Sequence, residues 1–355
     1  MGLRVGVAVV ALIGCGRQNF NPPDAPEDVT RANYAFVTST LHTGDLGGLE
    51  GADAICNERA LAGGLPGTYR ALLSTTTVDA VARFDGSRGW QRVDGKPIAD
   101  RLSQLTARRG WFPIAVDELG HDLRGELQTA VWTGSKSDGT GRDTCASWTS
   151  EVEAELGEGG ALDSGGARMF DTGRRGCDQR LRLYCFEEGE RAVTPPPVVD
   201  GRRAFATFSE WVPGGGIVDA DRLCNSEASA AGLVGSFAAA LRPDSATTAS
   251  RFEASALPWV RTDGVAITPA ATLFSAVALD VPIHLGASGE PLPPDASVWA
   301  GSPLVVTGGN CGNWASTSGE SPETGSVETT DYAKRFSFGA AGCSAMGIRL
   351  MCLER

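Results

Sequence analysis

Cysteine is the residue type whose spacing in this chain most clearly predicts chemistry. Eight of the nine cysteines form two sets of four. Neighbouring cysteines are 89, 32 and 8 residues apart in the first set, and 87, 32 and 9 in the second. Matched spacing of this kind is typical of disulfides formed in an oxidising compartment. Four cysteines allow three pairings in each set, and spacing alone does not choose among them. The sets are Cys56, Cys145, Cys177 and Cys185, and then Cys224, Cys311, Cys343 and Cys352.

Free thiols or a metal site are the alternatives to disulfides. The chain has no C-x-x-C pair and only 3 histidines, which stand at unmatched positions, and this argues against zinc. Ser135 and Ser302 are matched between the two parts of the chain, but no histidine or lysine is matched with them, as an activated serine would need. The G-x-S-x-G turn of many hydrolases is also absent. The histidines are His42, His121 and His284.

Charged residues offer two further possibilities. The acidic stretches at residues 151–163 and 320–331 could supply oxygen ligands to calcium, but they lack the D-x-D-x-D-G spacing of a known calcium loop, so we interpret them as solvated loops. A group of arginines in the first part of the chain could bind sulfate or phosphate, because a guanidinium donates to two oxygens at once. The alternative is a scatter of solvated arginines. These candidates are Arg83, Arg88, Arg92, Arg101, Arg108 and Arg109. We expect no catalytic residue, no metal and no cofactor.

Length and composition predict a globular protein of two domains. The chain has 355 residues, of which 42% are hydrophobic and 21% are charged, enough apolar material for two cores. Its formal net charge of −12 argues against nucleic acid as a partner, because phosphate binding requires a basic surface.

A long internal repeat supplies the elements that must position these residues. The words A-D-x-x-C-N and G-L-x-G-[TS]-aromatic-x-A-x-L occur near residues 52–73 and return near 220–241, an offset of 168 (224 − 56). Each copy predicts a helix with small residues on one face, ended by glycine and followed by a strand. Asp219 is a candidate N-cap of the second helix. A period this long indicates a duplicated domain, because solenoid repeats run to about 20–50 residues.

The N-terminal segment and the middle of the chain are predicted to lie outside the two domains. Residues 1–15 read as a lipoprotein signal peptide, whose short apolar run ends in a lipobox-like L-I-G-C with Cys15 as the lipidated residue. An ordinary cleaved secretory signal is the alternative. Residues 16–30 form a Pro/Asp-rich tether, and residues 189–201, with three consecutive prolines, a semi-rigid linker. The domains are residues 31–188 and 202–355.

The ordered motifs resemble a known family. A-D-x-x-C, G-L-x-G-[TS]-aromatic-x-A-x-L, V-W-x-G-S, C-x-x-W and a terminal pair of cysteines look like endostatin, the C-terminal module of certain collagens, and like bacterial lipoprotein domains with the same pattern. Both belong to the C-type-lectin-like fold. The resemblance implies an α+β protein of two tandem endostatin-like domains, each with antiparallel sheets, one or two flanking helices, long loops and two disulfides. The implied pairing is nested: Cys56–Cys185, Cys145–Cys177, Cys224–Cys352 and Cys311–Cys343.

The resemblance also bears on ligands. Lectins that bind sugar through calcium follow the tryptophan with Asn-Asp, whereas Trp148 and Trp314 are followed by Thr-Ser and Ala-Ser. The N-terminal histidine cluster that holds zinc in endostatin has no counterpart here. Endostatin-like modules bind heparin through clustered arginines, which adds a reason to consider the six arginines above.

The sequence therefore predicts a non-enzymatic surface lipoprotein. We expect a binding or adhesion module for an extracellular glycan or protein, held at the bacterial cell envelope by its lipid anchor, at the outer membrane or cell surface. A secreted, envelope-associated hydrolase with an unrecognised site is the alternative. An anchor at Cys15 would be its contact with the membrane.

Overall fold

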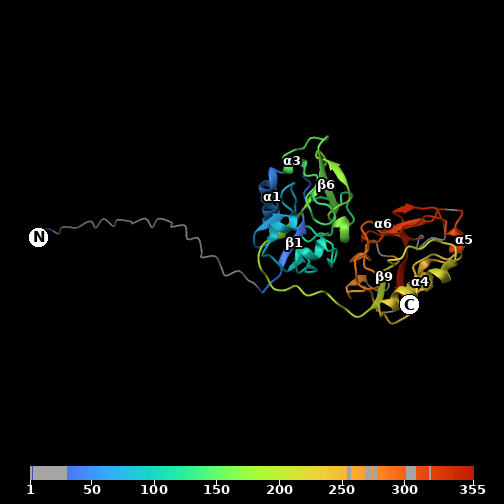
Figure 1. Ribbon diagram of the computed structural model, residues 1–355. Helices are drawn as coiled ribbons and strands as arrows, with labels where there is room; N and C mark the ends of the chain where they lie inside the picture. The colour runs from blue at the N-terminus through green and yellow to red at the C-terminus, as the bar shows by residue number, and fades with distance from the viewer. Residues whose placement is uncertain are drawn as a thin grey trace.

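The computed structural model of this chain describes residue 2 and residues 30–253, 257–268, 273–275, 278–300, 309–319 and 321–355. Over these residues the protein is mixed α+β, with several small sheets, few helices and four disulfides. Residues 31–188, here called the first half, and residues 202–355, the second half, lie side by side (Figure 1). Cys15, Ser302, most of the predicted signal peptide and most of the tether lie outside the described residues.

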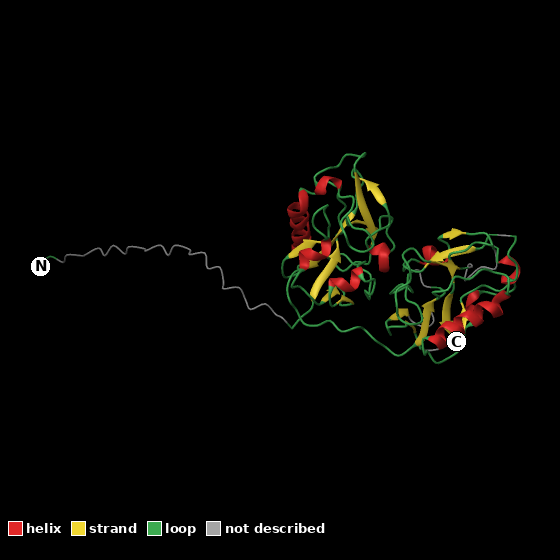
Figure 2. Ribbon diagram, viewed as in Figure 1, coloured by secondary structure: helices red, strands yellow, loops and turns green. Residues whose placement is uncertain are grey.

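The first half contains one long helix and eight short strands. Its long helix runs along the outside of the strands (Figure 2). In chain order the elements are β1 (Asn33–Val37), α1 (Gly48–Ala62), β2 (Tyr69–Ala71), η1 (Ala80–Phe84), β3 (Trp90–Arg92), β4 (Pro97–Ala99), α2 (Leu102–Thr106), β5 (Ala130–Trp132), α3 (Cys145–Trp148), β6 (Leu156–Ala161), η2 (Gly166–Met169), β7 (Arg174–Gly176) and β8 (Arg182–Glu187).

The second half repeats this order. Its elements are β9 (Arg202–Ala206), α4 (Gly216–Ala230), β10 (Phe237–Ala239), η3 (Thr248–Arg251), β11 (Trp259–Arg261), β12 (Ala266–Thr268), β13 (Ser297–Trp299), α5 (Cys311–Trp314), β14 (Glu323–Ser326), α6 (Tyr332–Phe336), β15 (Gly339–Ala340), β16 (Ile348–Arg349) and β17 (Met351–Glu354). The single strand β8 of the first half corresponds to β16 and β17 together.

The sheets of the two halves share one topology. In the first half the strand order is β4-β3-β1-β8-β5-β6-β7, with β2 also paired to β8. In the second half β10-β17-β9-β11-β12 and β15-β14-β13-β16 reproduce it in two pieces. The expectation of antiparallel sheets is wrong in one respect, because β1 pairs parallel to β3, β5 to β8, β9 to β11 and β13 to β16. Long connections carrying helices separate these partners, and such crossovers permit parallel pairing.

The repeated A-D-x-x-C-N motif holds the long helix against the sheet. The carboxylate of Asp53 accepts the backbone N–H of Ala71 at 2.9 Å, and Asn57 both accepts the N–H of Tyr69 at 2.9 Å and donates to its carbonyl at 2.8 Å. Asp221 and Asn225 make the same bonds in the second half, to the strand β10. The side chains therefore satisfy the polar backbone of a short strand that the helix covers.

The ends of the long helices differ in part from the sequence prediction. Gly63 caps α1, and Gly232 lies in the left-handed region just past α4, as expected for glycine after a helix. Asp219 is not the N-cap of α4, because the helix begins one turn earlier, after Gly215. The Asp219 carboxylate lies inside the first turn and accepts the indole N–H of Trp211 at 3.0 Å. A carboxylate in that turn is also favoured by the helix dipole.

Each half is closed by the two nested disulfides that the resemblance implies. Cys56–Cys185 and Cys224–Cys352 join the long helix to the last strand, with Cα separations of 5.4 and 5.6 Å. Cys145–Cys177 and Cys311–Cys343 close shorter loops, each with a Cα separation of 5.6 Å. The eight cysteines are thus used in pairs, and each pair has its counterpart in the other half.

A pair of buried tryptophans lies beside each shorter disulfide. Trp132 and Trp148 meet edge to face with ring centroids 5.8 Å apart, and Trp299 and Trp314 do the same at 5.9 Å. All four side chains are at most 1% exposed. These tryptophans are core residues, and edge-to-face pairs of this kind add to the stabilisation from burial.

The C-x-x-W motif itself forms a left-handed turn. All four residues of Cys145–Trp148 have positive φ, between 46° and 69°, and so do the four of Cys311–Trp314, between 55° and 67°. For residues other than glycine this conformation costs about 1–2 kcal/mol each. The disulfide at one end and the buried tryptophan at the other hold the turn in place.

Candidate functional site

Two of the six candidate arginines belong to the duplicated scaffold. Arg83 donates to the Asp53 carboxylate at 2.6 Å and to the carbonyl of Ala71, and Arg251 makes the equivalent contacts in the second half. Arg92 is 2% exposed and binds Asp94 through Nε at 2.9 Å. Arg261 is its buried counterpart and binds Asp263. Repetition of these contacts in both halves indicates a structural role.

The other four candidates do not join them in one free basic surface. Arg88 pairs with Asp100 at 2.5 Å within the first half. Arg108 donates to the carbonyl of Leu292, and Arg109 pairs with Glu290 at 2.5 Å, so both contact the second half. Arg101 is exposed and lines a hollow of about 340 Å³ beside Phe84 and Trp90. The sequence did not reveal these carboxylate and carbonyl partners, because most of them are distant in the chain and approach the arginines only in the folded protein.

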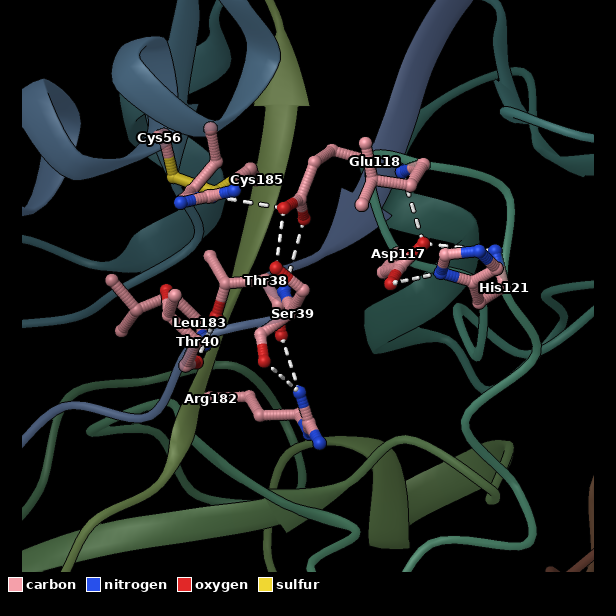
Figure 3. A network of polar contacts seen from close by, with 12 residues as sticks. Thr38, Ser39, Thr40, Cys56, Asp117, Glu118, His121, Arg182, Leu183 and Cys185 are labelled. Atoms are coloured by element: carbon pink, nitrogen blue, oxygen red, sulfur yellow. Dashed lines mark hydrogen bonds and ion pairs between the residues drawn. A yellow bond between two sulfur atoms is a disulfide. The ribbon is translucent and has the colours of Figure 1, made fainter. Parts of the chain in front are cut away.

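A polar network at the end of β1 contains serine, histidine and carboxylate groups (Figure 3). The buried Glu118 carboxylate accepts the backbone N–H of Ser39 at 2.9 Å, its hydroxyl, and Nε of Arg59 from α1 at 2.8 Å. His121 instead contacts Asp117, at 3.2 Å between Nδ1 and Oδ2. The serine hydroxyl and the imidazole thus have separate carboxylate partners, and the network anchors a loop on the helix.

In the second half, a single carboxylate from the long helix makes the equivalent hydrogen bonds to the backbone. Glu227 stands at the position of Arg59 (227 − 59 = 168), and its carboxylate accepts the N–H groups of Phe208 and Ser209 directly, at 2.9 and 2.8 Å.

The three histidines do not come together in one site. His284 is 2% exposed and its Nε2 lies 2.9 Å from the carbonyl of Arg108. Burial, with the nearby Arg261 charge, lowers the pKa of His284 to about 4.

The interpretation of the acidic stretches as solvated loops holds for residues 151–155, which are exposed, and is wrong for residues 157–163 and most of 321–331, which are buried. Residues 151–163 contain β6, and residues 320–331 contain β14. Glu158 and Asp163 are fully buried, and Glu328 is 1% exposed. Burial and the neighbouring Asp171 carboxylate raise the pKa of Glu158 to about 7, against the lowering effect of Arg142. Of these three carboxylates only Glu158 lies in a strand, and β6 is buried from Gly157 to Ala161, whereas Asp163 and Glu328 are covered where the two halves meet. Charge counting along the sequence does not detect such burial.

The two halves meet through segments that occupy equivalent positions in them. Ser164 forms an antiparallel bridge with Thr329, and Thr330 donates its backbone N–H to the carbonyl of Asp163 at 2.8 Å. Gly165 donates to the carbonyl of Glu328 at 2.8 Å. The offset between the halves here is 165 residues (329 − 164), as in the adjacent strands, where Gly160 pairs with Val131 and Gly325 with Val298. Each segment therefore pairs with its own counterpart, as in an approximately two-fold interface.

Side chains reinforce this interface. Glu328 accepts the N–H of Ala167 from the first half at 2.9 Å, and Lys334 pairs with Asp163 at 2.7 Å. Burial raises the pKa of Glu328 to about 7, although the bond from Ala167 acts in the opposite direction. Trp111 of the first half packs into a core cluster formed mainly by the second half. The two halves are therefore in direct contact, in addition to their covalent connection through residues 189–201.

A charged hollow of about 270 Å³ lies at the edge of this interface. Arg168, Arg175 and Lys334 line it, and the last of these comes from the second half. Arg168 and Lys334 stand at equivalent positions of the two halves (334 − 168 = 166). The sequence interpretation missed all three residues. The sequence does show that Arg168 and Lys334 are basic residues at equivalent positions of the repeat. It does not show that the two side chains line the same hollow, because that depends on how the halves pack.

Within the described ranges, no group of three or more histidine, cysteine, aspartate or glutamate side chains is arranged to hold a metal ion. In the same part of the chain, no helix combines the length and apolar character needed to cross a bilayer. No protein-family model matches this chain.

Proposed function

We propose that this chain is a non-enzymatic binding protein of the bacterial cell envelope, built from two tandem endostatin-like domains of the C-type-lectin-like fold and carried by a lipid on Cys15. In this proposal it binds an extracellular glycan or protein through the loops and hollows of the two halves.

The supporting observation is how the repeated residues are used. The matched cysteines, tryptophans, Asp53/Asp221 and Asn57/Asn225 make disulfides, core contacts and bonds to strand backbone in both halves. The connecting segments differ between the halves, and so do some residues of the helices and strands. A scaffold that is kept while its loops diverge is typical of binding domains, in which loops carry recognition.

The halves also differ where one carries a charged group that the other lacks. Arg175, in β7, corresponds to Ala341 (341 − 175 = 166). Glu158, in contrast, corresponds to Glu323, because Gly159 pairs with Trp132 in the first half as Thr324 pairs with Trp299 in the second. The halves therefore offer different surfaces, and need not bind the same partner.

A binding array tests the proposal. Purified full-length protein with oxidised disulfides, kept in mild detergent, is applied to immobilised glycans and extracellular proteins, and in parallel to soluble cell-envelope polymers. We expect saturable binding to one ligand class and no turnover. Turnover of a defined polymer that is abolished by a single substitution in a connecting loop would contradict the proposal and favour an envelope hydrolase.

A further inference from the structure

The hollow of about 270 Å³ between the halves has the composition of an anion site. Ala130 at the start of β5, together with Gly160 and Ala161 of β6, supplies small residues to its lining. Small side chains leave room at the surface of the sheet for the longer basic side chains from β7, η2 and α6 to converge.

Two of its three basic side chains already have a carboxylate partner. Lys334 pairs with the buried Asp163 at 2.7 Å. Arg168 pairs with Asp295 at 3.2 Å and also lies over the ring of Phe338, 5.2 Å from its centroid. These contacts fix the positions of both cations, so the hollow keeps its shape without a ligand.

Arg175 differs from these two. No carboxylate in the described part of the chain lies within ion-pair distance of it, and its Nη2 donates a hydrogen bond to the hydroxyl of Thr172 at 3.3 Å. Its Nε is buried without a hydrogen-bond partner among the described residues. A buried guanidinium donor left unsatisfied is costly. Because Nε is inaccessible, an oxyanion in the hollow would be bound by the terminal nitrogens of Arg175. A Cβ at Gly159 would lie 3.3 Å from Nε, so the glycine allows the close approach of this side chain.

Neutral polar groups surround the cations. The amides of Gln128 and Gln179 and the hydroxyl of Thr172 line the same hollow. Amides and hydroxyls can exchange hydrogen bonds with sugar hydroxyls, and a guanidinium fork matches the two oxygens of a carboxylate. The hollow is small for a drug-sized molecule, since such pockets usually measure about 300–1,000 Å³, and it fits one ligand unit.

We propose that this hollow binds the carboxylate of an acidic sugar unit, with Arg175 as the residue that holds the carboxylate and Lys334 as a second cation from the other half. The inference gives a ligand class to the proposed binding function and rests on it. Arg175 has alanine as its counterpart in the second half, so that position cannot hold a carboxylate there, and the site proposed here is assembled only when the two halves lie together.

Calorimetric titration of the full-length protein with D-glucuronate, D-glucose and inorganic phosphate tests the proposal. We expect saturable binding of glucuronate, with glucose weaker by about tenfold or more, as the loss of one charge-assisted bond set predicts. Phosphate should also bind more weakly, because it lacks the ring hydroxyls that Gln128, Gln179 and Thr172 would bind. Arg175→Gln should weaken glucuronate binding by about tenfold or more. Arg174→Gln is the matched control, because its neighbouring guanidinium pairs with Asp143 and does not line the hollow.

The outcomes separate the two proposals. Equal binding of glucose and glucuronate, tighter binding of phosphate, or unchanged glucuronate binding in Arg175→Gln would overturn the inference and leave the array result standing. If Arg175→Gln unfolds at a lower temperature than Arg174→Gln, Arg175→Lys replaces it, since lysine keeps the charge but loses the fork, and glucuronate binding should still fall. Turnover on the array with intact glucuronate binding would overturn the proposed function alone.

Discussion

Ala146 and Gly312 occupy the same position in the two left-handed C-x-x-W turns, with φ of 54° and 57°. Both are exposed. A Cβ built at Gly312 would meet only the Ser316 Cβ, at 3.7 Å, so crowding does not explain the glycine. The two halves thus hold the same backbone conformation with and without the steric cost of a side chain.

This relationship predicts opposite effects of exchanging the two residues. Ala146→Gly should stabilise the first half by roughly 1 kcal/mol. Glycine removes the steric cost of the left-handed conformation, and its greater entropy in the unfolded chain offsets part of that gain. Gly312→Ala should destabilise the second half by a similar amount. Chemical denaturation of each variant measures both. Loss of stability in Ala146→Gly would show that the turn is not held in this conformation.

The disulfides give a second prediction, based on loop length. Replacing both cysteines of the 32-residue loop closed by Cys145–Cys177 should cost roughly 4 kcal/mol, and removing Cys56–Cys185, with a separation of 129, roughly 5 kcal/mol, if unfolded-chain entropy dominates. The corresponding pairs of the second half should give the same order. A larger loss from the short loop than from the long one would argue against the entropic account.

Glu118 provides a test of the network at the end of β1. Glu118→Ala should destabilise the first half by roughly 1–3 kcal/mol, because it leaves the Ser39 N–H and the Arg59 guanidinium without their acceptor. The second half suggests the rescue. Adding Arg59→Glu places a carboxylate at the position of Glu227, and the double variant should recover part of the loss. Unfolding midpoints of the single and double variants decide this, and absence of any recovery would show that the helix position cannot reach the same backbone.

Glu328 predicts a dependence of stability on pH. Its pKa in the folded protein is about 7, raised by burial from the model-compound value of 4.5, so the folded state binds this proton more tightly than the unfolded chain. Its contribution is fully present below about pH 4.5 and is lost as the pH rises through about 7, by up to roughly 3 kcal/mol. Glu158 acts in the same direction. The charge of Asp295 also raises the pKa of Glu328, and the charges of Arg168 and Arg108 lower it.

Unfolding measured between about pH 5 and about pH 9 tests this assignment. Glu328→Gln should reduce the fall in stability towards high pH while still accepting the bond from Ala167. Glu158→Gln is the comparison variant and should remove a separate part of the same slope. An unchanged pH profile in both variants would contradict the assignment.

The proposed lipidation of Cys15 leads to a prediction about which cell fraction contains the protein. Cys15→Ala should move it from the membrane fraction to the soluble fraction of cells, because lipidation of this thiol is the proposed anchor. Fractionation with an antibody against the protein measures the shift, and incorporation of a labelled fatty acid should be lost in the variant. A variant that stays with the membrane points to another attachment.

Part of the fold followed from the sequence because its causes are local or repeated. Small residues at helical spacing predicted α1 and α4, and glycine predicted their ends. The matched cysteines predicted a disulfide framework, although its pairing rested on the resemblance. Asp219 was misassigned because a carboxylate near a helix start has more than one favourable place, and only the position of Trp211 decides between them.

What the sequence by itself determined is the duplication, with the helix, cysteine and tryptophan positions that both halves share, because these depend on residue type and spacing. Tertiary structure decided the role of the charges. Arg83 and Arg92 became buried scaffold residues, Glu158 turned inward on a strand, and Arg168 met Lys334 at one hollow. Burying a charged side chain is costly unless an oppositely charged or hydrogen-bonding group lies beside it. Such partners are often far apart in the chain and meet only in the folded protein.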